Sequence, residues 1–196
     1  MAYKPNDYFA QKAKKEGFKA RSVYKLMEID KKYKLFKKGM QVIDLGAFPD
    51  SWTQYISGVV GDGGKVLAID IQAIEIKLPN VVVVVEDIYK IDIKNVLEKN
   101  GFENSVEVVV SDMAPATTGV KVTDQARSLA LCEMAFEVAK IGLMKGGSFV
   151  CKLFDSGDTQ GFKKALQMVF KEVVIFRAKS TRTESKEIFL VGLSRL

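Results

Sequence analysis

The stretch MQVIDLGAFPDSW, residues 40–52, decides the predicted fold. It begins with a short apolar run that ends at a glycine, which is typical of a strand in an α/β sheet. Residues 51–60 then have the pattern of a helix, so the chain passes from a strand through a glycine turn into a helix. In open α/β sheets such a turn lies beyond the carboxyl end of the strand, where ligands bind. We therefore expect this turn to border a binding site.

Strand-like and helix-like segments alternate through the rest of the chain. We expect further strands at residues 65–70, 81–85, 106–112, 147–154, 172–178 and 187–193. Helices are predicted at residues 51–60, 91–100, 123–144 and 159–170, after two short N-terminal helices at 6–16 and 22–34 with Asn6 and Ser22 as their caps. This alternation indicates a mostly parallel sheet with helices on both faces.

The last two predicted strands are joined by residues 179–186 alone, with the polar sequence KSTRTESK. A parallel crossover needs a dozen or more residues, so we expect the final pair to be antiparallel. The predicted fold is therefore a Rossmann-like sheet of seven strands, mostly parallel, with the last strand antiparallel. This is the usual arrangement of S-adenosylmethionine methyltransferases, whereas a sheet that binds NAD is more often wholly parallel.

Composition limits the classes of protein to which the chain can belong. The chain has 196 residues, 47% of them hydrophobic, which predicts a single domain over residues 1–196. No apolar run reaches the roughly 18–20 residues that span a bilayer, so we expect no membrane association. With two cysteines and no histidine, we expect no metal site, and a general base must be a carboxylate, a lysine or a tyrosine. Two unpaired buried cysteines suggest a cytoplasmic protein, with an organelle left open.

Charge is divided unevenly along the chain. Residues 1–38 hold 12 Lys or Arg against 4 Asp or Glu, residues 39–162 hold 10 against 17, and residues 163–196 hold 8 against 3. If the two basic ends meet in space, they form one surface suited to a nucleic acid, although a merely solvated lysine face is the alternative. We expect helices 6–34 to be an RNA-binding extension, with phosphate contacts from Lys12, Lys15, Lys19, Arg21, Lys179 and Arg182.

Acidic residues follow three successive predicted strands beside the glycine turn. The dinucleotide pattern G-x-G-x-x-G is missing, because Phe48 and Ser51 stand where its second and third glycines would be, and this disfavours an NAD(P) dehydrogenase. A cofactor without phosphates but with cationic groups, S-adenosylmethionine, is expected instead. The next two strand ends offer acids for its ribose and adenine. The predicted cofactor-binding residues are Asp44, Gly46, Ala47, Phe48, Pro49, Asp50, Trp52, Asp70, Ile71, Asp87, Ile88 and Asp112.

Six segments together resemble the FtsJ/RrmJ-type ribosomal RNA large-subunit 2′-O-methyltransferases. They are KARSVYKL at 19–26, DLGA at 44–47, SDMAP at 111–115, DQARS at 124–128, GGSFVCK at 146–152 and EIFLV at 187–191. The likeness runs from about residue 6 to the end of the chain, and SDMAP and DQARS in this order are its most specific parts. The resemblance places a catalytic tetrad on Lys25, Asp112, Lys152 and Glu187.

The tetrad implied by the resemblance suits removal of a proton from a ribose 2′-hydroxyl. Neutral Lys152 is expected to act as the general base, and Lys25 to stabilise the developing alkoxide. Asp112 is expected to orient Lys152, and Glu187 to position the hydroxyl or a lysine. The resemblance further implies that the substrate is a uridine in the A-loop of large-subunit ribosomal RNA, within an assembled particle, and we expect the enzyme to be a monomer.

The loop after the first strand departs from the family pattern Gly-Ala-Ala-Pro-Gly-Gly-Trp. This chain has Gly46-Ala47-Phe48-Pro49-Asp50-Ser51-Trp52, so Asp and Ser replace two glycines. Asp50 is a candidate partner for the ammonium group of the cofactor. Two alternatives stay open: the ribose of a transfer RNA or of a messenger RNA cap as the methyl acceptor, and a non-catalytic RNA-binding or ribosome-assembly factor on the same fold.

Overall fold

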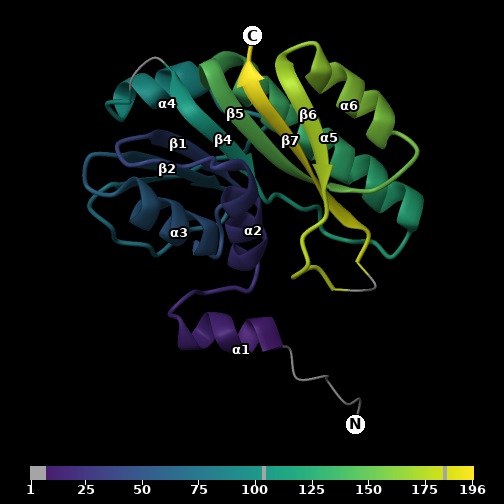
Figure 1. Ribbon diagram of the computed structural model, residues 1–196, viewed down its shortest axis with the longest axis horizontal. Helices are drawn as coiled ribbons and strands as arrows, with labels where there is room; N and C mark the ends of the chain where they lie inside the picture. Colours follow the sequence, from purple (N-terminus) through teal and green to yellow (C-terminus); the bar gives the residue numbers. More distant parts are fainter. Residues whose placement is uncertain (1–7, 103–104, 183–184) are drawn as a thin grey trace.

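The computed structural model describes residues 8–102, 105–182 and 185–196, and contains one seven-stranded sheet in the order β3-β2-β1-β4-β5-β7-β6 (Figure 1). β1 to β5 pair in parallel, and β7 is antiparallel to both of its neighbours. The predicted sheet is therefore confirmed. The strands are β1 Gln41–Leu45, β2 Lys65–Asp70, β3 Val81–Val85, β4 Val106–Ser111, β5 Leu143–Phe154, β6 Phe170–Phe176 and β7 Glu187–Arg195.

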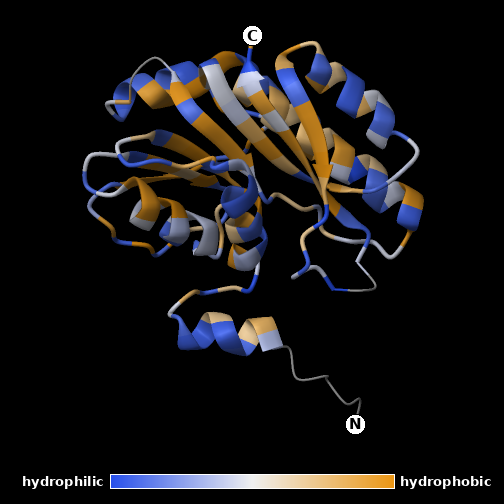
Figure 2. Ribbon diagram, in the orientation of Figure 1, coloured by the Kyte–Doolittle hydropathy of each residue, from blue (hydrophilic) through white to orange (hydrophobic). Residues whose placement is uncertain are grey.

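Helices cover both faces of this sheet, as predicted. α4, α5 and α6 pack on one face and α2 and α3 on the other, because alternate strand residues such as Val42 and Ile43 point to opposite sides. Figure 2 shows mainly apolar strands between helices whose outer sides are polar. The helices are α1 Tyr8–Lys15, α2 Val23–Tyr33, α3 Ser51–Val60, α4 Ile93–Lys99, α5 Lys121–Gly142 and α6 Thr159–Gln167.

Most differences from the predicted elements lie at their ends. α5 ends at Gly142 and β5 begins at once with Leu143, four residues before the predicted start at Gly147. The Arg195 side chain donates to the backbone carbonyls of Lys140 and Leu143, and so ties the end of β7 to the end of α5. Among the predicted caps, Asn6 lies outside the described residues, and Ser22 precedes α2 without a side-chain bond to a helix amide.

α1 stands apart from the sheet and is attached through α2 (Figure 1). The Tyr24 hydroxyl donates to a Glu16 carboxylate oxygen at 2.7 Å, and the rings of Phe9 and Tyr24 lie 5.5 Å apart. Ala13, Val23 and Tyr24 form a small buried cluster of their own. None of the described helices combines the length and the apolar character that crossing a bilayer requires.

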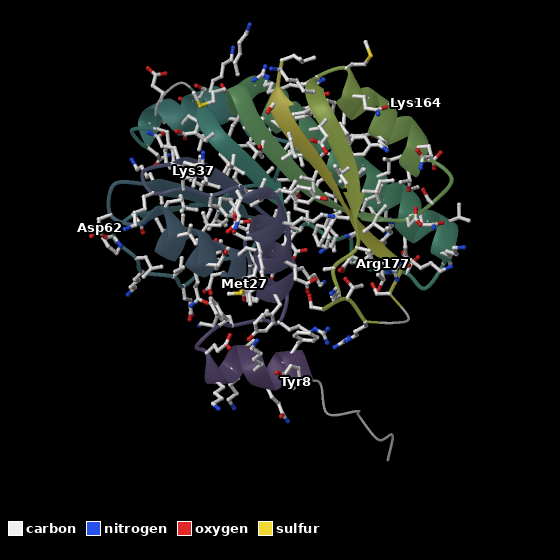
Figure 3. All side chains as sticks on the ribbon, in the orientation of Figure 1. Tyr8, Met27, Lys37, Asp62, Lys164 and Arg177 are labelled. Atoms are coloured by element: carbon white, nitrogen blue, oxygen red, sulfur yellow. The ribbon has the colours of Figure 1, made fainter. Side chains whose placement is uncertain are left out.

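The loop between β6 and β7 is fastened to α2. The Glu28 carboxylate accepts hydrogen bonds from the backbone amides of Lys179 and Ser180 at 2.7 and 2.9 Å, and the Arg21 guanidinium donates to the Ser180 carbonyl. Figure 3 shows Arg177 at the start of this loop on the side of the domain that also bears Met27 of α2 and Tyr8 of α1. The two basic ends of the chain thus meet in space.

Candidate active site

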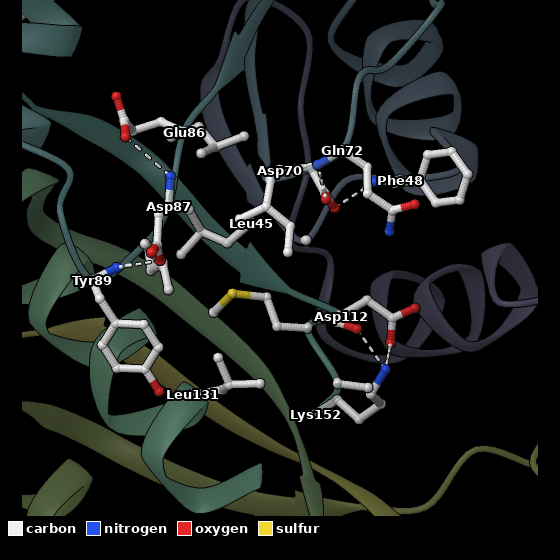
Figure 4. Close-up of a pocket in the computed structure, with 16 residues that line it drawn as sticks. Leu45, Phe48, Asp70, Gln72, Glu86, Asp87, Tyr89, Asp112, Leu131 and Lys152 are labelled. Carbon is white, nitrogen blue, oxygen red and sulfur yellow. Dashed lines mark hydrogen bonds and ion pairs between the residues drawn. The ribbon is translucent and has the colours of Figure 1, made fainter. Parts of the chain in front are cut away.

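A cavity of about 410 Å³ opens at the carboxyl ends of the first four strands (Figure 4). Its volume suits a ligand of nucleoside size, and its position is where open α/β sheets bind ligands. The turn after β1, the ends of β2 to β4, α5 and Lys152 of β5 contribute to its wall. The residues lining it are Leu45, Gly46, Phe48, Ile69, Asp70, Ile71, Gln72, Glu86, Asp87, Ile88, Tyr89, Asp112, Met113, Ala114, Leu131 and Lys152.

Gly46 allows the chain to turn against the cavity wall. Its φ is +73°, and a Cβ atom there would lie 2.6 to 2.9 Å from atoms of Met113, so no larger residue fits without movement. The amides of Gly46 and Ala47 both donate to the Ile69 carbonyl of β2, at 2.9 and 3.2 Å. The sequence requirement for glycine is therefore both conformational and steric.

Carboxylates at the ends of β2 and β3 are held by backbone amides. Asp70 accepts from the amides of Phe48 and Gln72 at 2.9 and 2.8 Å, and Asp87 accepts from the amide of Tyr89 at 3.0 Å. Each carboxylate is oriented by these bonds and lines the cavity. Because a carboxylate has about four acceptor positions, each keeps capacity for the hydroxyl or amino groups of a nucleoside.

Asp44 lies behind the cavity wall and is fully buried. The Thr53 hydroxyl donates to one of its carboxylate oxygens at 2.6 Å, while the other oxygen has no hydrogen-bond partner among the described residues. Burial raises the pKa of Asp44 to about 7; the Thr53 bond opposes this rise, and the neighbouring charges of Asp112 and Asp70 add to it. An unpartnered buried carboxylate beside a cavity is suited to a cationic ligand group.

The predicted cofactor residues divide into two groups. Gly46, Phe48, Asp70, Ile71, Asp87, Ile88 and Asp112 line the cavity, whereas Asp44, Ala47, Pro49, Asp50 and Trp52 do not. Trp52 is buried against Phe189, with ring centroids 5.9 Å apart. Gln72, Tyr89 and Leu131 line the cavity but were not singled out from the sequence. The signal for the first two was their position directly after the expected residues 71 and 88.

Sheet register brings Lys152 and Asp112 together. Ser111 of β4 pairs with Cys151 of β5, so the next residue on each strand reaches the same edge of the sheet. The Lys152 amine lies 2.8 Å from an Asp112 carboxylate oxygen and also donates to the Asp112 backbone carbonyl. Figure 4 shows the Lys152 side chain directed at Asp112 beside the cavity. The pair is mostly buried, with side-chain exposures of 8% and 17%.

A second ion pair joins residues far apart in sequence. Lys25 of α2 and Glu187 of β7 lie 2.6 Å apart and are 13% and 10% exposed. Phe154 is the strand partner of Glu187, which places Lys152 diagonally across from Glu187 on the same face of the sheet. The four residues of the expected tetrad therefore form two ion pairs at one end of the sheet.

A family model described as FtsJ-like methyltransferase matches residues 18–195, nearly the whole chain. The chain belongs to this family. Proteins of this methyltransferase family take their methyl group from S-adenosylmethionine, which confirms the expected cofactor. The described residues contain no group of three or more His, Cys, Asp or Glu side chains placed to hold a metal ion.

Two curated relatives and one solved structure are similar to this methyltransferase over nearly the whole chain. The chain is 48% identical over 195 residues to the ribosomal RNA large subunit methyltransferase E of Bdellovibrio bacteriovorus, with 100% of both chains covered. It is 48% identical to the protein of the same name from Lawsonia intracellularis, covering 95% of this chain and 94% of the other. A crystal structure described as a ribosomal RNA methyltransferase of Plasmodium falciparum superposes with a TM-score of 0.81 at 26% identity, covering 91% of this chain and 99% of that one.

The basic residues expected to contact RNA lie on α1, on the segment before α2 and on the β6–β7 loop of this methyltransferase. Lys15, Lys19, Lys179 and Arg182 are exposed. Lys12 is 3.8 Å from Glu16 and lies over the Tyr24 ring, and Arg21 lies over the Phe9 ring. Lys12 and Arg21 thus also hold α1 against the domain.

Proposed function

We propose that this methyltransferase methylates a ribose 2′-hydroxyl of ribosomal RNA, at a uridine in the A-loop of the large subunit. The observation that carries the proposal is the Lys152–Asp112 pair on the cavity wall, with the Lys25–Glu187 pair on the same face of the sheet. The names of the curated relatives, which specify the large-subunit ribosomal RNA, support the choice of substrate.

The cavity residues fit S-adenosylmethionine, whose sulfonium supplies an electrophilic methyl group when it is bound. Asp70 would accept the ribose hydroxyls, and Asp87 with Ile88 would receive the adenine. Asp44, with its unpartnered carboxylate oxygen, supplies negative charge behind the wall for the ammonium or the sulfonium. We propose Gly46 and Phe48 as the part of the turn that contacts the cofactor, because these two residues line the cavity.

We propose Lys152 as the general base. A neutral amine has two N–H groups and one lone pair, and Asp112 offers two acceptors, its carboxylate oxygen and its backbone carbonyl. Once the ammonium of the ion pair has lost one proton to solvent, its two remaining N–H groups can stay bound in this way, and the lone pair is left for the proton of the 2′-hydroxyl. Asp112 is thus the residue that orients the base, which is the role expected for it from the sequence.

Lys25 would supply the positive charge that stabilises the developing alkoxide. Its ion pair with Glu187 fixes the ammonium at one place, and preorganised charge of this kind lowers the barrier because little reorganisation is needed during the reaction. Of the two roles expected for Glu187, positioning the hydroxyl or positioning a lysine, this contact favours the second.

The proposed partner is ribosomal RNA within an assembled large subunit, bound by a monomer. Residues 1–196 are proposed to act as one methyltransferase domain, with residues 6–34 as its RNA-binding extension. The two curated relatives are bacterial, and bacterial subunits are assembled in the cytoplasm, which is therefore the proposed compartment.

Methyl transfer to undermethylated large ribosomal subunits tests the proposal. With labelled S-adenosylmethionine, we expect label in large-subunit RNA, and nuclease mapping to place it on one 2′-O-methyluridine in the A-loop. Transfer RNA and capped messenger RNA serve as competing substrates, and preferential labelling of either would replace the proposed acceptor. Calorimetric absence of cofactor binding, together with retained RNA binding, would instead indicate a non-catalytic assembly factor.

A further inference from the structure

Two successive residues at the start of α3 form hydrogen bonds to the segment that joins α1 to α2. We call this segment, residues 16–22, the basic linker, because it carries Lys19 and Arg21. The Ser51 hydroxyl accepts a hydrogen bond from the Ala20 amide at 2.6 Å. The Trp52 indole N–H donates to the Ser22 carbonyl at 2.9 Å.

Asp50 directly precedes Ser51 and is also buried, and one of its carboxylate oxygens has no hydrogen-bond partner among the described residues. Burial raises the pKa of Asp50, and the positive charge of Lys19 acts against that rise, so the carboxylate lies within electrostatic reach of Lys19. Ser51 and Trp52 thus bond to Ala20 and Ser22, and Asp50 lies within electrostatic reach of Lys19. We call these three residues of α3 and its cap the linker clasp.

The clasp is directed to the linker and away from the cofactor cavity. None of its three residues lines the cavity, whereas Gly46 and Phe48 of the same turn do. Asp50 and Ser51 are only 4% and 1% exposed, and Asp50 has a φ of +77°, a region that favours glycine. Burying polar side chains costs free energy unless they find partners, and the partner of Ser51 is in the linker.

These interactions give Asp50 and Ser51 a role at the two loop positions where the family pattern has glycine. A glycine at position 51 has no hydroxyl for the Ala20 amide, and a glycine at position 50 has no charge for Lys19. With glycine at positions 50 and 51, the hydrogen bond from the Trp52 indole to the Ser22 carbonyl is the part of the clasp that would remain. The replacements therefore add one hydrogen bond to the linker and one carboxylate near Lys19, without adding a side chain to the cavity wall.

We propose that the linker clasp positions Lys19 and Arg21 for the phosphates that flank the target nucleotide. The inference rests on the proposed RNA substrate and adds one positioning residue, Ser51, that acts through the linker. α2 begins directly after the linker and carries Lys25, so the clasp also fixes the offset between the phosphate contacts and the Lys25–Glu187 pair.

Ser51→Gly and the double variant Asp50→Gly/Ser51→Gly test the clasp. Both fit the fold, because glycine adopts a φ of +77° freely and the Asp50 side chain bonds no helix amide. We expect Ser51→Gly to speed hydrogen exchange of the Ala20 amide about tenfold, and to weaken binding of an A-loop RNA fragment and raise the KM for large subunits about fivefold. The dissociation constant for S-adenosylmethionine and kcat should stay within about twofold in both variants.

Ser57→Ala is the matched control, because Ser57 lies on the same helix, is also buried and donates to Asn80 at 2.6 Å. It should leave the RNA affinity unchanged. The clasp is overturned if Ser51→Gly leaves Ala20 exchange and RNA affinity unchanged, if it weakens cofactor binding alone, or if Ser57→Ala weakens RNA binding equally. Hydrogen exchange of the Ala20 amide and RNA affinity can both be measured without turnover. If the wild-type enzyme methylated no subunit, that result would contradict the proposed function and leave the clasp to be judged by these two measurements.

Discussion

Two carboxylates at neighbouring strand ends, the buried Asp44 and the partly buried Asp112, have opposite surroundings. Asp112 is bound to the amine of Lys152, whereas Asp44 has no cationic partner among the described residues and receives only the Thr53 hydroxyl. A charged carboxylate without a partner is costly to bury, which is why the pKa of Asp44 rises to about 7. The free protein therefore carries an electrostatic strain that a bound cation would relieve.

Replacing Asp44 by Asn tests this strain. Because the pKa of Asp44 is near 4 in the unfolded chain and about 7 in the folded one, the folded state binds more protons between these values, and wild-type stability falls as pH rises through them. Asp44→Asn removes this loss. Its free energy of unfolding, relative to wild type, should rise by up to roughly 4 kcal/mol from pH 4 to pH 8. Urea unfolding at several pH values measures it, and a difference independent of pH would contradict the assignment.

At the scale of elements, the loop between β6 and β7 depends on α2 for its position. The Glu28 carboxylate accepts hydrogen bonds from the amides of Lys179 and Ser180, and the Arg21 guanidinium donates to the Ser180 carbonyl. The loop leads directly into Glu187, so this attachment also helps to place the Lys25–Glu187 pair. α2 thus organises both a basic surface and half of the tetrad.

Glu28→Ala should release the loop. We expect the amides of Lys179 and Ser180 to exchange at least about tenfold faster, since hydrogen bonds to a charged group are among the stronger ones, and methyl transfer to large subunits to lose efficiency. Hydrogen exchange read by mass spectrometry measures the first effect. Glu133→Ala, an exposed acid on α5, is the control with the same change of charge. Unchanged loop exchange in Glu28→Ala would refute the attachment.

Elements were predictable from the sequence to the extent that local pattern determines them. β2 and β3 have the bounds that their apolar runs predict, and the short connection at 179–186 was enough to require an antiparallel end. The contacts between distant segments were not predictable in this way. The Lys25–Glu187 pair could be placed only through the family resemblance, and the roles of Ser51 and Trp52 toward the linker depend on tertiary packing that no local periodicity records.

At the scale of the whole molecule, the fold brings together basic segments that lie far apart in the sequence. The basic N-terminal helices and the basic β6–β7 loop lie together on one side, as Figure 1 shows, while the acidic middle of the chain builds the cofactor cavity. A polyanion that is drawn to the basic side would be held beside the tetrad. Association with RNA should therefore depend strongly on salt.

Replacing Lys15, Lys19 and Lys179 by Gln should flatten the salt dependence of RNA binding. Each lost phosphate contact reduces the slope of log K against log salt by roughly 0.7 to 0.9, so the slope of the triple variant should fall by roughly 2 to 3. Filter binding between low and moderate salt measures it. The control removes the same charge from Lys94, Lys99 and Lys164, exposed residues of α4 and α6 on the far side of the domain. Equal slopes for the two variants would mean that the basic side is only a solvated face.

The most direct test of the account is a single-turnover methyl-transfer assay with Lys152→Ala on undermethylated large subunits, with cofactor binding measured by calorimetry. The account predicts that transfer falls by at least roughly 100-fold, the range expected when a general base is removed, while the affinity for S-adenosylmethionine changes little. Transfer at a near wild-type rate by a variant that lacks this amine would contradict it.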